Sequence, residues 1–298
     1  MPRVSVIIPT FNRENRVGIA IQSVLDQTYQ DLEIIACDDG STDKTVEVLT
    51  SIQKKSKLPV RIEVLPYNLG VSAARNKAIY LAEGELIAFL DSDDSWKPEK
   101  LEKQIRFLDR NPEFIGVGCN IEFLNKLSNT NCQIGSNYLL DSSKELFQLL
   151  YECCIITSCF LVKKEALILA GLFDLRLKKS EDRDLWWRLP RLGRIGYLNE
   201  PLVNYLVHEA NISNMMNNET GETYIPAIKR TIWYWRDKLT AEEIRKIYSI
   251  SHLMVALDAT GRNYYFLSVR HAVTAMLYGN HIVAATKLII SRTISLFR

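Results

Sequence analysis

The strongest constraint on the fold is a repeated alternation of short apolar runs with helical patterns in the first 90 residues. The apolar runs cover residues 4–8, 33–37, 60–65 and 86–90. They are short, rich in β-branched residues and bounded by turn formers, as buried strands are. Between the first two, Val17, Ala20, Ile21, Val24 and Leu25 recur at the spacing of an amphipathic helix. Strands alternating with helices predict an α/β fold with a mostly parallel, doubly wound sheet.

The fourth run ends in an acidic loop, Asp91-Ser92-Asp93-Asp94, which places three carboxylates within four residues. Such a cluster beside a buried strand is costly to desolvate unless a positive charge accompanies it. A hard divalent cation such as Mg²⁺ takes one or two protein carboxylates together with substrate phosphates. A surface turn rich in Asp and Ser has the same composition. The loop by itself therefore leaves both interpretations open.

Three polar segments follow the first, second and fourth runs. They are Thr10-Phe11-Asn12, Asp38-Asp39 and Asp91-Ser92-Asp93. In a doubly wound sheet, ligands bind outside the carboxyl ends of the strands, so we expect the three segments to share one pocket. Neither G-x-G-x-x-G nor G-x-x-x-x-G-K-[ST] occurs in the chain, so a metal held by carboxylates is the expected partner of any phosphate.

The pattern is looser beyond Trp96. We expect strands over residues 114–119, 155–162, 195–198 and 202–207, and a helix that starts at the second acidic cluster, Glu181-Asp182-Arg183-Asp184. From about residue 220 the chain is predicted to be helical to its end. We therefore expect a catalytic domain over residues 1–220, with a nucleotide-binding half (1–95) and an acceptor half (96–220), followed by a helical C-terminal region, 221–298.

Composition restricts the partners and the location. The net charge of +2 over 298 residues argues against a dedicated nucleic-acid-binding protein. Six cysteines occur in apolar stretches without metal-site spacing, which predicts buried free thiols and a reducing compartment. No leader pattern and no apolar run of membrane-spanning length is found, so we expect a cytoplasmic protein.

The C-terminal region leaves two interpretations open. Residues 231–298 hold nine Lys/Arg and four Asp/Glu, and residues 282–297 place apolar side chains on one helical face. A basic amphipathic helix of this kind is typical of contact with anionic lipid at the inner face of the membrane. The same face would also suit packing on the catalytic domain or a homodimer interface.

Taken in order, the motifs resemble the family 2 inverting glycosyltransferases, which have the GT-A fold. The matching segments are residues 4–13, Asp38-Asp39-Gly40-Ser41-Thr42-Asp43, Asn68-Leu69-Gly70, Ala74-Arg75-Asn76, Phe89-Leu90-Asp91-Ser92-Asp93-Asp94 and Glu181-Asp182. The resemblance covers residues 3 to 210, is strongest up to about residue 110 and is absent beyond about 215. The resemblance is specific because the motifs occur together and in the expected order.

The resemblance implies a nucleotide-sugar donor, a UDP-sugar above all, and Mg²⁺ or Mn²⁺ as cofactor. The acceptor would be a hydroxyl on a saccharide or a lipid-linked saccharide, in the assembly of a cell-surface polysaccharide or glycolipid. The residues that the resemblance places at the donor are Pro9, Thr10, Phe11, Asn12, Asp39, Arg75, Asp91, Ser92 and Asp93. Among them Thr10, Phe11 and Asp39 would contact uracil and Asp91 the ribose. Asp93 would bind the metal together with His208, and Asp182 would be the catalytic base.

Transfer with inversion needs two kinds of help. The leaving diphosphate gathers negative charge, which a metal stabilises, and the incoming hydroxyl must lose a proton, which a positioned carboxylate accepts. Asp91 and Asp93 suit the first task and Asp182 the second. Glu181 and Asp184 are near enough in sequence to compete with Asp182, although Glu181 would equally stabilise the helix N-terminus.

Other functions fit the motifs less well. A sugar-phosphate nucleotidyltransferase would need a glycine-rich, Arg-containing loop after the first strand, and residues 9–13 contain no glycine. A non-catalytic nucleotide-sugar-binding protein would lack the metal or base carboxylate, whereas Asp93 and Asp182 are both present. A glycosidase also uses paired carboxylates but has no need of a phosphate-associated metal.

Overall fold

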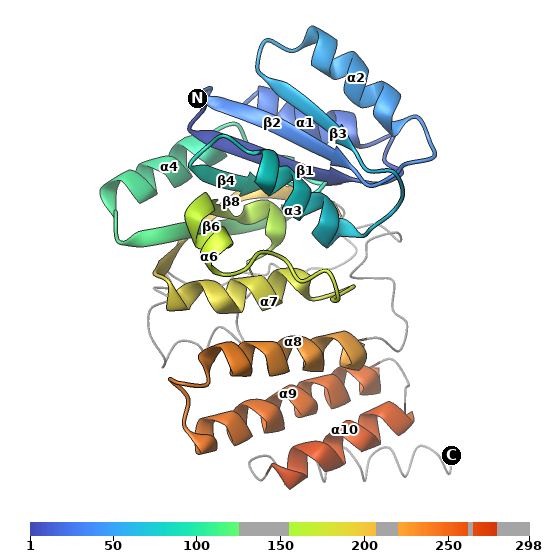
Figure 1. Ribbon diagram of the computed structural model, residues 1–298, viewed down its shortest axis with the longest axis vertical. Helices are drawn as coiled ribbons and strands as arrows, with labels where there is room; N and C mark the ends of the chain where they lie inside the picture. Colours follow the sequence, from blue (N-terminus) through green and yellow to red (C-terminus); the bar gives the residue numbers. More distant parts are fainter. Residues whose placement is uncertain (125–154, 207–219, 262–264, 279–298) are drawn as a thin grey trace. The chain divides into compact units, whose positions relative to one another are not determined.

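A computed structural model describes residues 1–124, 155–206, 220–261 and 265–278 (Figure 1). The chain divides into two compact units, Met1–His208 and Glu209–Arg298. The boundary expected from the sequence was residue 220, and the segment between the two positions lies outside the described residues. His208 and the amphipathic segment 282–297 lie outside them as well.

The first half of the first unit is a parallel sheet with helical connections. Its strands are β1 (Val4–Thr10), β2 (Leu32–Asp38), β3 (Val60–Val64) and β4 (Leu86–Phe89), in the order β3-β2-β1-β4. The connecting helices are α1 (Val17–Leu25), α2 (Thr45–Lys55) and α3 (Val71–Leu81). Val4 of β1 is in register with Leu32 on one side and Leu86 on the other. The predicted strands and helices of this half are confirmed.

The second half completes a sheet of eight strands with the order β3-β2-β1-β4-β7-β6-β8-β5. Its elements are β5 (Ser95–Trp96), α4 (Lys100–Arg110), β6 (Phe114–Phe123), the 3₁₀ turn η1 (Thr157–Cys159), β7 (Leu161–Lys163), α6 (Lys164–Leu169), α7 (Glu181–Arg188), the 3₁₀ turn η2 (Leu189–Arg191) and β8 (Arg194–Tyr205). β7 is antiparallel to both β4 and β6, while β6 and β8 are parallel. The predicted α/β class is confirmed, with the antiparallel strands confined to this half.

Two strand predictions in this half were wrong. Residues 155–162 do not form one strand, because η1 replaces its centre and β7 begins only at Leu161. The turn leaves backbone groups of Ser158 and Cys159 available to side chains of other elements. The two strands expected over residues 195–198 and 202–207 form the single strand β8. Shifts in its register with β6 accommodate the polar residues at its centre.

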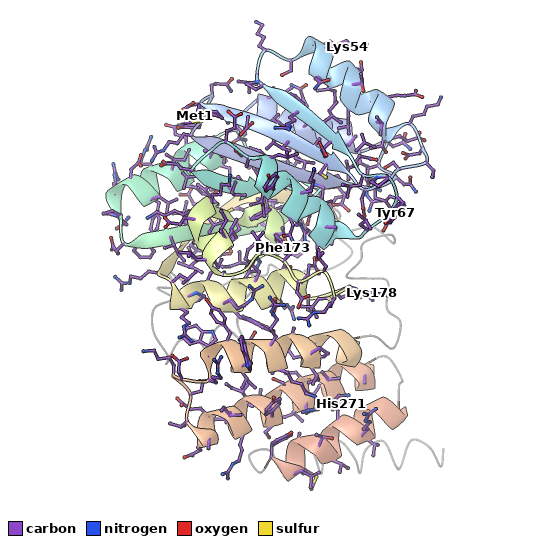
Figure 2. All side chains as sticks on the ribbon, viewed as in Figure 1. Met1, Lys54, Tyr67, Phe173, Lys178 and His271 are labelled. Atoms are coloured by element: carbon purple, nitrogen blue, oxygen red, sulfur yellow. The ribbon has the colours of Figure 1, made fainter. Side chains whose placement is uncertain are left out.

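An aromatic cluster fixes α7 against the sheet. The Trp186 ring lies 5.6 Å from that of Phe89 at the end of β4 and 4.6 Å from that of Phe160, measured between centroids. Phe173, labelled in Figure 2, packs edge-on against Phe89 at 5.6 Å. Trp186 is fully buried, and burying a large aromatic side chain contributes several kcal/mol. α7 is thereby held against the carboxyl end of β4 through Trp186.

The second unit is helical over its described residues, as predicted. It contains α8 (Thr220–Trp235), α9 (Ala241–Gly261) and α10 (Tyr265–Leu277). Small residues let α9 and α10 approach closely, with Ala256 and Ala272 in the contact. Among the helices within the described ranges, none has both the length and the apolar content required to cross a bilayer.

Candidate active site

The loops after β1 and β2 lie side by side, as the parallel pairing predicts. The Asp39 backbone N–H donates to the Thr10 carbonyl oxygen at 2.8 Å. The buried Asp39 carboxylate accepts hydrogen bonds from the backbone N–H groups of Leu69 (2.7 Å) and Gly70 (2.9 Å), and burial raises its pKa. Gly70 has a φ of 93°, which suits glycine at this sharp entry into α3. Asp39 therefore joins a third loop to the first two.

The residues at the end of β1 and just after it lie at the same edge of the sheet, which is called the rim below. Asn12, at a φ of 52°, accepts the Thr42 backbone N–H at 2.9 Å, and its own N–H donates to Ser41 Oγ at 2.8 Å. Phe11 is 38% exposed, whereas Pro9 and Thr10 are buried in β1. Within the described part of the chain, the buried Thr10 hydroxyl has no hydrogen-bond partner. A buried hydroxyl without a partner is a natural contact for a polar ligand.

The acidic loop after β4 divides into carboxylates with different surroundings. Asp94 is 3% exposed, accepts from Ser158 Oγ at 2.5 Å and from the Leu206 backbone N–H at 3.3 Å. Burial, together with the charge of Asp91, raises the pKa of Asp94 to about 8. Asp93 lies 3.8 Å from Arg13, measured between Oδ2 and Nη2, and Ser92 is buried beside it. Asp94 is thus held by the protein, while Asp91 and Asp93 lie nearer the solvent.

Arg75 of α3 links this loop to α7. Its Nη2 lies 2.7 Å from Asp91 Oδ1 and its Nη1 lies 2.8 Å from Glu181 Oε1. Burial lowers the pKa of the guanidinium, but the two carboxylates outweigh burial and the net pKa is raised. Burial also raises the pKa of Glu181, to about 7, and the neighbouring charge of Asp182 adds to the shift.

The three carboxylates at the start of α7 have distinct environments. Glu181 pairs with Arg75, and the fully buried Asp184 pairs with Arg188 at 2.7 Å. Asp182 is partly exposed, accepts from Thr157 Oγ1 at 3.3 Å and, within the described part of the chain, forms no salt bridge. Its charge contributes to the raised pKa of Asp91, after burial and Asp93, so the two acidic clusters of the sequence converge.

The residues present fit a divalent cation bound jointly with a phosphate ligand. Among the described residues no group of three His, Cys, Asp or Glu side chains forms a complete metal site. Mg²⁺ commonly takes only one or two protein carboxylates, and Asp93 beside Asp91 offers that set. Burial is the main cause of the raised pKa of Asp91; Arg75 opposes the shift, and the charges of Asp93 and Asp182 add to it.

Sequence reasoning missed the contribution of η1. Ser158 Oγ accepts the Asp91 backbone N–H at 3.1 Å and donates to Asp94, while Thr157 donates to Asp182. The Trp96 indole N–H donates to the Ser158 carbonyl oxygen at 2.8 Å. One short turn therefore contacts both acidic clusters. The available signal was the polar pair Thr157-Ser158 inside an otherwise apolar run.

Comparison with known proteins indicates the family of the chain. The family model for glycosyl transferase family 2 matches residues 5–168. An uncharacterized glycosyltransferase of Rickettsia typhi is 32% identical over 261 residues, which is 84% of this chain and 77% of that protein. A Bacillus subtilis protein named as a teichuronic acid biosynthesis glycosyltransferase, TuaG, is 47% identical over 109 residues, or 36% of this chain and 42% of TuaG.

Two solved structures show the same fold. Staphylococcus aureus TarS 1–349 in complex with UDP superposes with a TM-score of 0.71 over 98% of this chain and 89% of that one, at 18% identity. The mannosyltransferase PcManGT of Pyrobaculum calidifontis, in complex with GDP-Man and Mn²⁺, has a TM-score of 0.64 at 18% identity, covering 99% of this chain and 81% of that one. The eight-stranded sheet is accordingly a GT-A sheet. The chain belongs to glycosyl transferase family 2 and is a glycosyltransferase.

Proposed function

We propose that this protein is a metal-dependent, inverting glycosyltransferase that moves a sugar from a UDP-sugar to a hydroxyl acceptor in cell-surface polysaccharide assembly. The observation that carries the proposal is geometric: Arg75 and the turn η1 both link the loop of Asp91 to the start of α7, where Asp182 lies. One carboxylate pair at the end of β4 and one partly exposed carboxylate on α7 match the two tasks of a single displacement. The TuaG relative, named for teichuronic acid biosynthesis, supports the polysaccharide assignment.

The donor would lie across the carboxyl ends of β1, β2 and β4. The exposed ring of Phe11, the unpartnered hydroxyl of Thr10 and the Asp39 carboxylate offer the stacking surface and polar contacts that a uracil base requires. Pro9 and Asn12 would shape this rim, and Asp91 with Ser92 would receive the ribose. The TarS structures that contain UDP and UDP-GlcNAc support a uridine nucleotide.

The leaving diphosphate would be neutralised beside Asp93. Asp93, with His208 outside the described residues, would hold Mg²⁺ or Mn²⁺, and the Mn²⁺ in the PcManGT complex supports this choice. A cation bound there stabilises the charge that develops on the leaving oxygen. Arg13, 3.8 Å from Asp93, adds a second positive group on the same side.

Asp182 would take the proton from the acceptor hydroxyl. Of the three carboxylates on this turn of α7, Glu181 and Asp184 each use one oxygen in an ion pair with an arginine. Asp182 instead accepts from Thr157, which orients it without neutralising its charge. A positioned general base typically contributes about 10²–10⁴-fold to the rate.

The C-terminal unit would bring the enzyme to its acceptor. Its described helices expose the apolar side chains of Trp233, Leu257 and Leu277. We propose that this unit contacts the inner face of the membrane, where a lipid-linked saccharide would be available, or forms a homodimer. Flotation with phosphatidylglycerol vesicles and light scattering after size-exclusion chromatography distinguish the two arrangements.

A donor screen tests the proposal. The protein is incubated with Mg²⁺ or Mn²⁺ and a panel of UDP-, GDP- and dTDP-sugars, and binding and slow donor hydrolysis are measured. We expect metal-dependent UDP binding that Asp93→Ala abolishes and Asp182→Asn retains, with turnover in Asp182→Asn reduced about 100-fold or more. Asp31→Asn is the matched control, because Asp31 is exposed next to the amino end of β2.

Two results would overturn the proposal. Full turnover in Asp182→Asn would remove the assigned base. Consumption of a nucleoside triphosphate with a sugar phosphate would instead indicate a nucleotidyltransferase.

A further inference from the structure

We propose that Arg75 is a positioning residue that joins the donor side of the site to the base side, rather than a group that binds the donor diphosphate. It holds the loop at Asp91 and the first turn of α7 at Glu181 in one fixed relation, and thereby sets where Asp182 lies. This inference rests on the proposed roles of Asp91 and Asp182.

The geometry of the guanidinium supports this role. Its two terminal nitrogens contact carboxylates that belong to different segments, 16 and 106 residues away in the sequence, at 2.7 and 2.8 Å. The Arg75 side chain is only 4% exposed, and that of Glu181 is 12% exposed. Both terminal nitrogens are therefore engaged inside the protein. A diphosphate would therefore meet a guanidinium whose charge two carboxylates already balance.

The surroundings of Arg75 restrict its movement further. Its guanidinium carbon lies 5.3 Å from the centroid of the Phe173 ring. The backbone of Phe173 is in turn held by the side chain of Asn76, which accepts its N–H at 3.0 Å and donates to its carbonyl at 2.8 Å. Consecutive residues of α3 thus fix the guanidinium and the surface against which it packs. Arg75 thus connects α3 to the loop after β4 and to the first turn of α7.

Arginine suits this position because its planar group presents donors in two directions at once. Lysine carries a compact charge on a flexible stem and cannot span two carboxylates with the same directionality. Without the Arg75 guanidinium, Asp91 and Glu181 would repel each other and α7 would shift. A displacement of about 1 Å at a catalytic group is enough to reduce the rate about 100-fold.

The test uses Arg75→Lys, Glu181→Gln and the double variant in the full-length protein, with Lys77→Met as the matched control. Lys77 lies on the same helix and pairs with Glu63 at the surface, with 40% and 28% of their side chains exposed. Three quantities are measured: the dissociation constant of UDP with Mg²⁺, turnover of the donor identified by the screen, and amide hydrogen exchange over residues 182–185.

We expect Glu181→Gln and Arg75→Lys each to reduce turnover 10- to 100-fold while the dissociation constant of UDP changes less than threefold. Exchange over residues 182–185 should accelerate in both. The double variant should be no slower than Arg75→Lys, because both substitutions break the same link. Lys77→Met should behave as the wild type.

Three outcomes would overturn the inference. Glu181→Gln could leave turnover and exchange unchanged, the two substitutions could act additively, or Arg75→Lys could weaken UDP binding as much as it slows turnover. The last outcome would assign Arg75 to donor binding and not to the position of the base. If the wild type does not bind UDP, only the proposed function fails, since hydrogen exchange still reports whether Arg75 and Glu181 stabilise the same turn of α7.

Discussion

Arg75 and Lys100 are both buried cations in the same unit, and their surroundings are opposite. Arg75 contacts two carboxylates, Asp91 and Glu181. Lys100 is completely buried, donates to Gln104 Oε1 at 2.8 Å and lies 3.9 Å above the Trp96 ring. No carboxylate within the described residues pairs with Lys100. The pKa of Arg75 is raised in spite of burial, whereas burial lowers the pKa of Lys100 to about 8.

The contrast shows what distinguishes the site from the core. At the site, opposite charges are held at hydrogen-bonding distance, so that removing one member leaves the others buried without compensation. In the core, a single ammonium group is tolerated through an amide and an aromatic face, and its charged form opposes folding. Charge at the site therefore stabilises a specific geometry, while charge at Lys100 reduces stability.

The largest expected effect comes from removing the cation of the site. Arg75→Met leaves the buried Glu181 and the partly exposed Asp91 without their cation, and we expect it to lower the free energy of unfolding by about 3 kcal/mol. Urea denaturation at pH 7 measures the change. Lys77→Met, which removes an exposed pair, should cost less than about 1 kcal/mol. A loss below 1 kcal/mol in Arg75→Met would remove the distinction between the two cations.

The next prediction concerns how the stabilities of the wild type and of Lys100→Met differ as the pH rises. Because the Lys100 pKa falls from 10.5 in the unfolded chain to about 8 in the folded protein, the unfolded chain binds the extra proton between these values. Raising the pH from 7 to 9.5 should therefore stabilise the wild type relative to Lys100→Met by about 2 kcal/mol. Thermal and urea denaturation of both proteins across this range measure the difference. A difference that stays constant would show that Lys100 titrates as an ordinary lysine.

The smallest expected effect comes from removing an uncharged hydrogen-bonding group of the site, the Ser158 hydroxyl. Ser158→Ala removes the hydroxyl that donates to Asp94 and accepts from the Asp91 backbone. We expect a loss of about 1–2 kcal/mol in the free energy of unfolding, because buried polar groups lose a partner but no charge is exposed. Urea denaturation tests this against Arg75→Met. A loss equal to that of Arg75→Met would mean that the number of hydrogen bonds, and not charge, controls stability here.

The two halves of the first unit differ in how far local sequence predicts them. The strands near residues 4–8, 33–37 and 86–90 were predicted correctly, because each is apolar on both faces and is followed at once by turn-forming polar residues. Residues 155–162 are also mainly apolar, yet their centre forms η1. Its conformation is set by Trp96 and Gln104, which hydrogen-bond to the turn from elsewhere in the chain.

By itself, the sequence determined the parallel βαβ half and the placement of three polar loops at one edge, since hydrophobic periodicity and the geometry of parallel strands leave few alternatives. It also identified the acidic cluster at the start of α7. The family resemblance already favoured Asp182 over Glu181 and Asp184 as the base, but only the tertiary structure shows that the latter two each pair with an arginine. One of them, Arg75, is 106 residues from Glu181, and no local pattern records a contact at that separation.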